Sequence, residues 1–131
     1  MEIDHIGIAV KSLAATTPRW ERLLGVSAAA PEEVGSQHVR VTFLEAGSTH
    51  IELLEPTNAD SAVGRFLETR GEGMHHVAFQ VPSVDRELTK LAERGERVID
   101  RQGRPGARGR IVGFAHPAAF AGVLVEFVER R

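Results

Sequence analysis

Cysteine is absent from this chain of 131 residues. Its absence excludes disulfide bridges, zinc-thiolate sites and thiol nucleophiles together, and it fits a reducing compartment. Any metal that the chain binds must therefore be held by nitrogen and oxygen ligands.

The chain also has little excess charge and no long apolar run. Lysine and arginine together number 16 and aspartate and glutamate 18, so the formal net charge is −2. This balance gives no field for wrapping nucleic acid or for holding an anionic membrane. No apolar segment is long enough to span a bilayer, and the N-terminus lacks the profile of a signal peptide. We therefore expect a soluble, cytoplasmic protein that binds neither nucleic acid nor a membrane.

What the chain does contain is a pattern that occurs twice. Residues 4–10 (DHIGIAV) reappear as residues 75–81 (HHVAFQV), and residues 50–55 (HIELLE) reappear as residues 124–129 (LVEFVE). Each copy thus opens with a histidine and closes with a glutamate. Two copies related by a pseudo-two-fold axis would bring two imidazoles and two carboxylates together, which is a suitable ligand set for a divalent metal.

The first copy opens with a predicted strand and helix. Residues 3–10 alternate, which places His5 on a face of small residues and leaves a face of branched residues for a helix to cover. Ser12 is expected to cap that helix, and Gly25 is expected to end it. The expected buried stripe of the helix consists of Leu13, Trp20, Leu23 and Leu24.

The second copy repeats these elements, with a strand around His76 and a helix between Ser83 and Gly95. Further strands are expected at residues 37–44, 50–54, 111–115 and 122–128. We interpret each copy as a β-α-β-β-β module, and the fold class is α+β. We predict a single domain of residues 1–131, with modules at about 1–56 and 73–131 and a linker at 57–72 that contains a helix.

Residues 101–110 set the second copy apart. This stretch is rich in glycine and arginine, and we expect it to be too polar and too flexible for a strand. It is interpreted either as a gate or ligand clamp, or as a solvated, disordered hairpin tip, which the composition slightly favours.

Four side chains are candidate metal ligands: His5, Glu52, His76 and Glu126. The two glutamates lie among apolar residues, where an unpaired buried carboxylate is costly, so a cation is the simplest partner. The alternative is an exposed strand face with the carboxylates in water. The agreement of four positions favours the metal site.

This ligand set suits cobalt, manganese, nickel, magnesium or zinc better than calcium. An octahedral ion with four protein ligands keeps two adjacent positions for a chelating substrate. Such an ion would polarise a carbonyl and stabilise an enolate next to it. The expected chemistry is therefore proton abstraction alpha to a carbonyl.

Four segments resemble the methylmalonyl-CoA epimerase family of the vicinal oxygen chelate superfamily, and they occur in the family's order. They are residues 3–10, residues 50–56, residues 73–79 and the ending, HP at 116–117 with GVLVE at 122–126. The resemblance implies two modules that form an incomplete barrel around the metal, usually in a homodimer. It implies the same four ligands and the epimerisation of methylmalonyl-CoA, an acyl-CoA substrate, at C2 through a metal-chelated enolate.

Epimerisation requires two acid/base groups, and the resemblance assigns one of them to Glu126. Some relatives carry the second as a glutamate after a Gln-Gly-Val segment, but the matching residue here is Val41, which cannot move protons. Glu45 shares the strand parity of Val41 and is a candidate for the second group, although a solvated glutamate beside a turn is its plainer interpretation. A metal-bound water and Glu52 are the alternatives.

Substrate-binding residues are predicted in two places. Gln37 is predicted to donate a hydrogen bond to the substrate carboxylate, because of its place in the motif. Relatives commonly carry a lysine after the His-Pro pair, where this chain has Ala118. If that lysine holds the CoA phosphates, Arg104, Arg108 and Arg110 are candidates to replace it, since guanidinium groups pair well with phosphate. The alternative is that these arginines only keep the loop soluble.

Two other functions compete with the epimerase. Bacterial glyoxalase I resembles this scaffold and uses a comparable His/Glu quartet, although the HH pair at 75–76 and the HP pair at 116–117 argue against it. A non-catalytic binding protein of the same superfamily would not need the four ligands, so their presence argues against that function.

Overall fold

The structure is a computed structural model, and it describes residues 1–129. The chain divides into two compact units. The N-terminal unit is His5–His75, and the C-terminal unit runs from His76 onward and includes Met1–Asp4. Within residues 1–129, no helix has both the length and the apolar character needed to cross a membrane.

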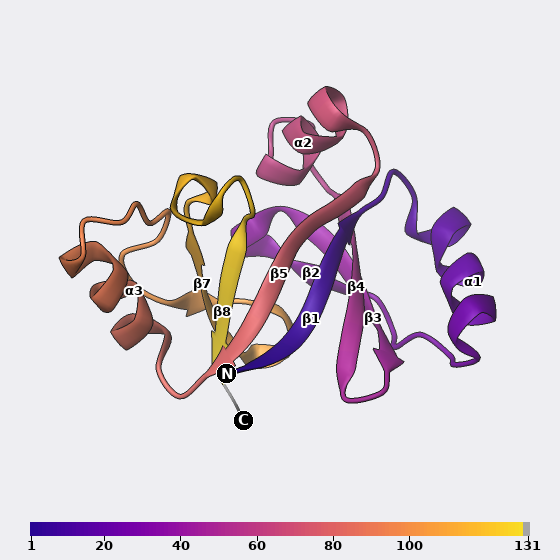
Figure 1. Ribbon diagram of the computed structural model, residues 1–131. Coiled ribbons are helices and arrows are strands. Elements are labelled where there is room, and N and C mark those ends of the chain that lie inside the picture. The colour runs from indigo at the N-terminus through magenta and orange to yellow at the C-terminus, as the bar shows by residue number, and fades with distance from the viewer. Residues whose placement is uncertain (130–131) are drawn as a thin grey trace. The chain divides into compact units, whose positions relative to one another are not determined.

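The N-terminal unit contains strands in the order β2-β3-β4-β1 (Figure 1). Strand β1 is parallel to β4, and the pairings of β3 with β4 and of β2 with β3 are antiparallel. In the parallel pair, Gly7 lies opposite Glu52, so His5 is two residues from the register position of that glutamate. The bounds are β1 Glu2–Ala9, β2 Glu32–Val34, β3 Val39–Ala46 and β4 Thr49–Pro56.

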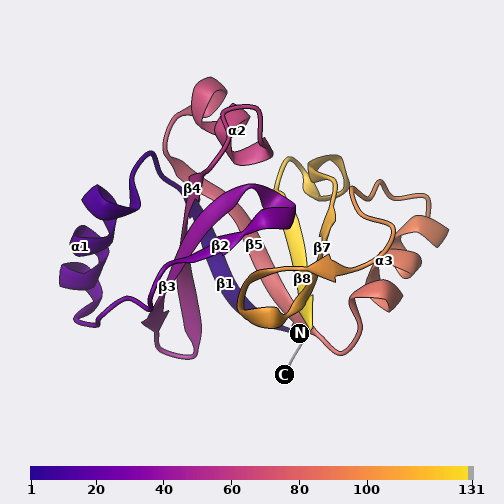
Figure 2. The same cartoon turned by 180° about the vertical axis from the view of Figure 1, so that it is seen from behind.

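Helix α1, Leu13–Leu24, packs on this sheet beside β3 and β4 (Figure 2). The Ser12 hydroxyl accepts a hydrogen bond from the Ala15 N–H at 3.1 Å, and Gly25 ends the helix with a φ of 69°, as predicted. The predicted stripe packs on Leu44 and Leu53, except for Leu23, which is 73% exposed. That prediction was wrong, because one residue turns a helix by about 100° and Leu24 already occupies the buried direction.

The linker helix is confirmed as α2, Ala62–Arg70. The Ser61 hydroxyl caps it by accepting a hydrogen bond from the Gly64 N–H at 3.0 Å. Val63 is its buried residue, and the ring of Phe66 contacts the ring of His75 edge-on, with centroids 4.9 Å apart.

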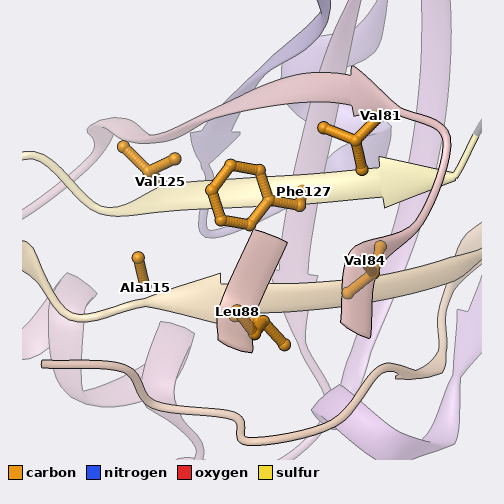
Figure 3. Close-up of a cluster of buried hydrophobic side chains, with 6 residues drawn as sticks. All are labelled: Val81, Val84, Leu88, Ala115, Val125 and Phe127. Atoms are coloured by element: carbon orange, nitrogen blue, oxygen red, sulfur yellow. The ribbon is translucent and has the colours of Figure 1, made fainter. Parts of the chain in front are cut away.

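The C-terminal unit repeats this topology, with strands in the order β5-β8-β7-β6. Strand β5 is parallel to β8, and the other two pairings are antiparallel. Helix α3, Val84–Glu93, lies over β7 and β8, and Figure 3 shows its Leu88 beside Phe127 in a buried apolar cluster. The bounds are β5 Gly73–Val81, β6 Arg104–Pro105, β7 Ile111–Ala115 and β8 Val125–Glu129.

Several predicted strands differ from the structure in their bounds or in their existence. Gln37 ends a 3-10 turn, η1 Gly35–Gln37, and lies outside the strand predicted to contain it. The last strand begins at Val125, because the 3-10 turn η3, Pro117–Phe120, and the positive φ of Gly122 precede it. The stretch 101–110 contains β6 and the 3-10 turn η2, Ala107–Gly109, so the prediction that it could form no strand was wrong.

Candidate metal centre

The N-terminal unit brings His5 and Glu52 together. The Nε2 atom of His5 lies 3.2 Å from Oε1 of Glu52. Phe43 is opposite Glu52 in the β3–β4 ladder, and its ring meets the His5 ring edge-on, with centroids 5.6 Å apart. The aromatic ring therefore packs beside the imidazole on the face that carries the carboxylate.

The C-terminal unit builds the same group from His76 and Glu126. The Nε2 atom of His76 lies 2.9 Å from Oε1 of Glu126. Ala78 is opposite Glu126 in the β5–β8 ladder, so the histidine is again two residues from the register position of its glutamate. Phe114 is opposite Glu126 in the next ladder, and its ring meets the His76 ring edge-on at 5.7 Å.

Both pairs are buried. The four residues are only 3–5% exposed. Within residues 1–129, they are the histidines and glutamates whose side chains could serve as metal ligands. A buried carboxylate is costly unless a donor or a cation compensates it, and the imidazole of the same unit supplies at least one such contact. The alternative prediction, carboxylates on an exposed strand face, is excluded by this burial.

The geometry within each pair fits two ligands of a common ion. Imidazole nitrogen and carboxylate oxygen bind divalent metals at about 2.0–2.2 Å, so two such ligands at right angles lie about 3.0 Å apart. The observed separations of 3.2 Å and 2.9 Å match this value. Each unit therefore presents one nitrogen and one oxygen donor, and the four buried side chains are consistent with a divalent metal site.

Asp4 organises the arginine-rich loop. Its buried carboxylate lies 2.8 Å from Nη2 of Arg110 and 3.6 Å from Nη2 of Arg108, and it accepts a hydrogen bond from Nε2 of Gln80 at 3.0 Å. The Nε–H of Arg110 also donates to the backbone carbonyl of Glu129 at 3.0 Å. These contacts hold the loop in place, so the disordered hairpin tip is not what the structure contains.

Arg104 differs from the other two arginines. Its guanidinium carbon lies 5.5 Å from the centroid of Phe114, and its Nε lies 3.2 Å from Oδ1 of Asp100. Oδ2 of Asp100 accepts a hydrogen bond from the Phe114 N–H at 2.9 Å. Asp100 therefore contacts both the guanidinium of Arg104 and the backbone of Phe114, whose ring lies under that guanidinium.

The remaining candidates lie on or near β3. Val41 is fully buried and apolar, so that position can move no proton. Glu45 is exposed and pairs across the ladder with His50, whose ring lies edge-on to Phe43 at 6.3 Å. Gln37 is half-buried in its turn.

Sequence reasoning missed Phe43, Phe114 and Asp4. The two phenylalanines had a usable signal in the alternation of their strands. Phe43 lies two residues after Val41, and Phe114 lies two residues after Val112, so each shares a face with a buried valine. The signal for Asp4 was a charged residue that follows Ile3 in a predicted strand, directly before a candidate ligand.

Comparison with known sequences adds three findings. The sequence pattern described as Glyoxalase/Bleomycin resistance protein/Dioxygenase superfamily matches residues 4–114. The chain is 42% identical over 127 residues to the uncharacterized protein YqjC of Bacillus subtilis, covering 97% of this chain and 91% of that protein. It is 36% identical over 127 residues to an ethylmalonyl-CoA/methylmalonyl-CoA epimerase of Cereibacter sphaeroides, covering 95% of this chain and 94% of that enzyme.

Among solved structures, a variant of Streptomyces coelicolor methylmalonyl-CoA epimerase in complex with 2-nitronate-propionyl-CoA is similar to the chain. The TM-score is 0.93 at 38% identity, and the match covers 98% of this chain and 94% of that one. The bound compound is an acyl-CoA analogue, so this related enzyme binds an acyl-CoA ligand.

Proposed function

The chain belongs to the Glyoxalase/Bleomycin resistance protein/Dioxygenase superfamily, and within it we propose that this protein is a metal-dependent methylmalonyl-CoA epimerase. Its fold is the vicinal oxygen chelate fold that the sequence predicted, with two β-α-β-β-β modules. The observation that carries the proposal is the buried imidazole–carboxylate pair that each unit presents with the same geometry. The epimerase relatives supply the substrate class.

In this proposal His5, Glu52, His76 and Glu126 hold one divalent ion. The donor set of nitrogen and oxygen fits cobalt, manganese, nickel, magnesium or zinc. When bound, the ion supplies Lewis-acid stabilisation of the negative charge that develops on the thioester oxygen. Phe43 and Phe114 pack against the two imidazoles and fix the orientation of their rings.

Protons are moved by the carboxylates of the chain. Glu126 removes the C2 proton, and a second carboxylate returns a proton to the opposite face of the planar carbon. Glu52 is our first choice for the second group, because it is buried and paired with an imidazole as Glu126 is. Glu45, the other candidate from the sequence, is exposed beside His50.

The experiment is deuterium exchange at C2 of methylmalonyl-CoA in heavy water, with the protein loaded with cobalt or manganese. We expect exchange and interconversion of the two epimers, and both should stop when the metal is chelated. Glu45→Gln distinguishes the carboxylates, because unchanged kinetics in this variant exclude Glu45 and leave Glu52 or a metal-bound water as the second group. A metal-loaded protein that exchanges no C2 hydrogen contradicts the proposal.

A glyoxalase I-type reaction is the second candidate, and the observation that favours it is Val41. This buried valine removes the glutamate expected of an epimerase, whereas two metal-bound carboxylates suffice to shift a proton along a hemithioacetal. Formation of S-lactoylglutathione from methylglyoxal and glutathione, without C2 exchange, would favour this activity.

The sequence-based expectations of a homodimer and a cytoplasmic location belong to the same proposal. Light scattering of the metal-loaded protein tests the first, and cell fractionation tests the second.

A further inference from the structure

A groove lies on the face of the C-terminal unit that is opposite to the His76 face. Side chains alternate along β5, so Val77 and Phe79 point away from the face that carries His76. Their register partners on β8, Val125 and Phe127, belong to the apolar cluster under α3 (Figure 3). Helix α3 packs on β7 and β8, so the side chains of β5 are covered less and form the floor of a groove of about 500 Å³.

The matching side of the N-terminal unit is filled by larger side chains. Counted from the serine that caps each helix, Trp20 of α1 matches Leu91 of α3. Leu24, at the end of α1, likewise matches Gly95, which follows α3. Trp20 and Leu24 pack on the apolar cluster of their own unit. A leucine and a glycine replace an indole and a leucine in the C-terminal unit, so less side-chain volume covers the sheet there.

Apolar side chains are exposed around this groove. Phe120, at the end of η3, is 38% exposed, and Val123, which follows that turn, is 47% exposed. Met1 lines the groove as well and is 75% exposed. A single exposed apolar residue is ordinary, but a group of them beside an apolar floor is typical of a surface that binds a partner.

The charged side chains that line the groove all come from α3. Glu87 lies in the first half of the helix, whereas Lys90 and the exposed Arg94 lie at its C-terminal end. Glu87 and Arg94 are therefore about 10 Å apart along the helix axis. The other lining side chains are apolar, so the groove lacks the convergent polar groups that orient a small ligand. An anionic ligand would also meet the carboxylate of Glu87 in the same wall.

We infer that the groove binds a second copy of this chain across a two-fold axis. In such an interface both copies use the same patch, so the patch must complement itself. Two antiparallel α3 helices meet this requirement, because Glu87 of each copy faces Arg94 of the other. The net charge of −2 leaves little repulsion between copies. The inference goes beyond the proposed reaction, since it needs neither metal nor substrate, and it names the surface of the homodimer expected from the sequence.

The test is analytical ultracentrifugation of the whole, metal-free chain, with circular dichroism to show that each variant is folded. Val123→Glu introduces a carboxylate that the dimer would bury, so it should raise the dimer Kd by about tenfold or more. Ile99→Glu is the matched control, because Ile99 is 51% exposed and does not line the groove. Leu91→Trp copies the residue that fills the N-terminal unit, and it should weaken the dimer without adding charge. A dimer that Val123→Glu and Ile99→Glu weaken equally overturns the inference, because its interface lies elsewhere.

Charge reversal tests the two-fold pairing of the helices. Arg94→Glu sets like charges against each other and should raise the dimer Kd by about 3–10-fold, whereas Glu87→Lys added to Arg94→Glu should restore most of the affinity. A double reversal that restores nothing overturns the pairing. A wild type that stays monomeric at about 100 μM overturns the inference as a whole. Binding of decanoate to that monomer, lost in Leu91→Trp, would then assign the groove to an apolar ligand. Failure of C2 exchange affects none of these results.

Discussion

The two units present the same triplet of side chains around a buried imidazole. In both, the carboxylate lies about one hydrogen-bond length from Nε2, at 3.2 Å and 2.9 Å, and a phenylalanine ring meets the imidazole edge-on, at 5.6 Å and 5.7 Å. The triplets are His5–Phe43–Glu52 and His76–Phe114–Glu126.

The units differ in what lies beyond the phenylalanine. The ring of Phe43 contacts His50 at 6.3 Å, whereas Phe114 supports the Arg104 cation at 5.5 Å. The C-terminal unit also holds a buried ion pair between Asp4 and Arg110. In the proposed function, the repeated part supplies the four ligands of the ion, two from each unit. The part that differs belongs to one unit alone.

The largest expected effect is the loss of epimerisation when one of the two buried carboxylates is removed. Glu126→Gln and Glu52→Gln each remove one acid/base group, so each should lower epimerisation about 10²–10⁴-fold. Because the remaining carboxylate still serves one face of C2, each variant should retain exchange with one epimer and lose it with the other. Exchange measured separately on the two epimers checks this. Normal turnover of Glu126→Gln would contradict the proposed role of Glu126.

Arg110→Met tests a contact that only the C-terminal unit has. Removing the arginine leaves the carboxylate of Asp4 buried with a weaker set of partners, which costs about 3–5 kcal/mol of unfolding free energy. Arg101→Met is the matched control at an exposed position and should change stability by less than about 0.5 kcal/mol. Urea denaturation measures both. A cost for Arg110→Met as small as that of the control would show that the ion pair does not hold the loop.

The features that the two units share could largely be predicted from the sequence. The repeat located all four buried His and Glu side chains, and the capping residues Ser12 and Gly25 fixed the ends of α1. These features depend on strand parity and local hydrogen bonding, which a short segment carries by itself.

The order of the loop could not be predicted in the same way. Arg110 is held by Asp4, a residue 106 positions earlier in the chain, so the composition of residues 101–110 alone suggested disorder. The stacking of Arg104 on Phe114 likewise depends on the pairing of β6 with β7 and on Asp100. Long-range partners of this kind leave no periodic signal in the sequence.

Metal binding should stabilise the two units together, since each supplies half of the proposed ligands. At a free metal concentration of 100 times Kd, the gain in unfolding free energy is about 2.7 kcal/mol. His5→Ala and His76→Ala should each remove most of this gain, because three ligands bind the ion more weakly than four. Thermal unfolding with and without cobalt measures the shift. A gain that survives one substitution would show that the pair in the other unit suffices.

The smallest expected effect concerns the phenylalanines. Phe43→Leu and Phe114→Leu each remove an edge-on ring contact with an imidazole, which is worth about 0.5–1.5 kcal/mol beyond the area that the ring buries. Both changes should weaken cobalt binding by a similar factor, below about tenfold, because they loosen an imidazole without removing a ligand. Stability should distinguish them, since the Phe114 ring also supports the Arg104 guanidinium. In urea denaturation, Phe114→Leu should therefore lower the free energy of unfolding more than Phe43→Leu does. Equal losses would mean that the contact between Arg104 and Phe114 adds no measurable stability.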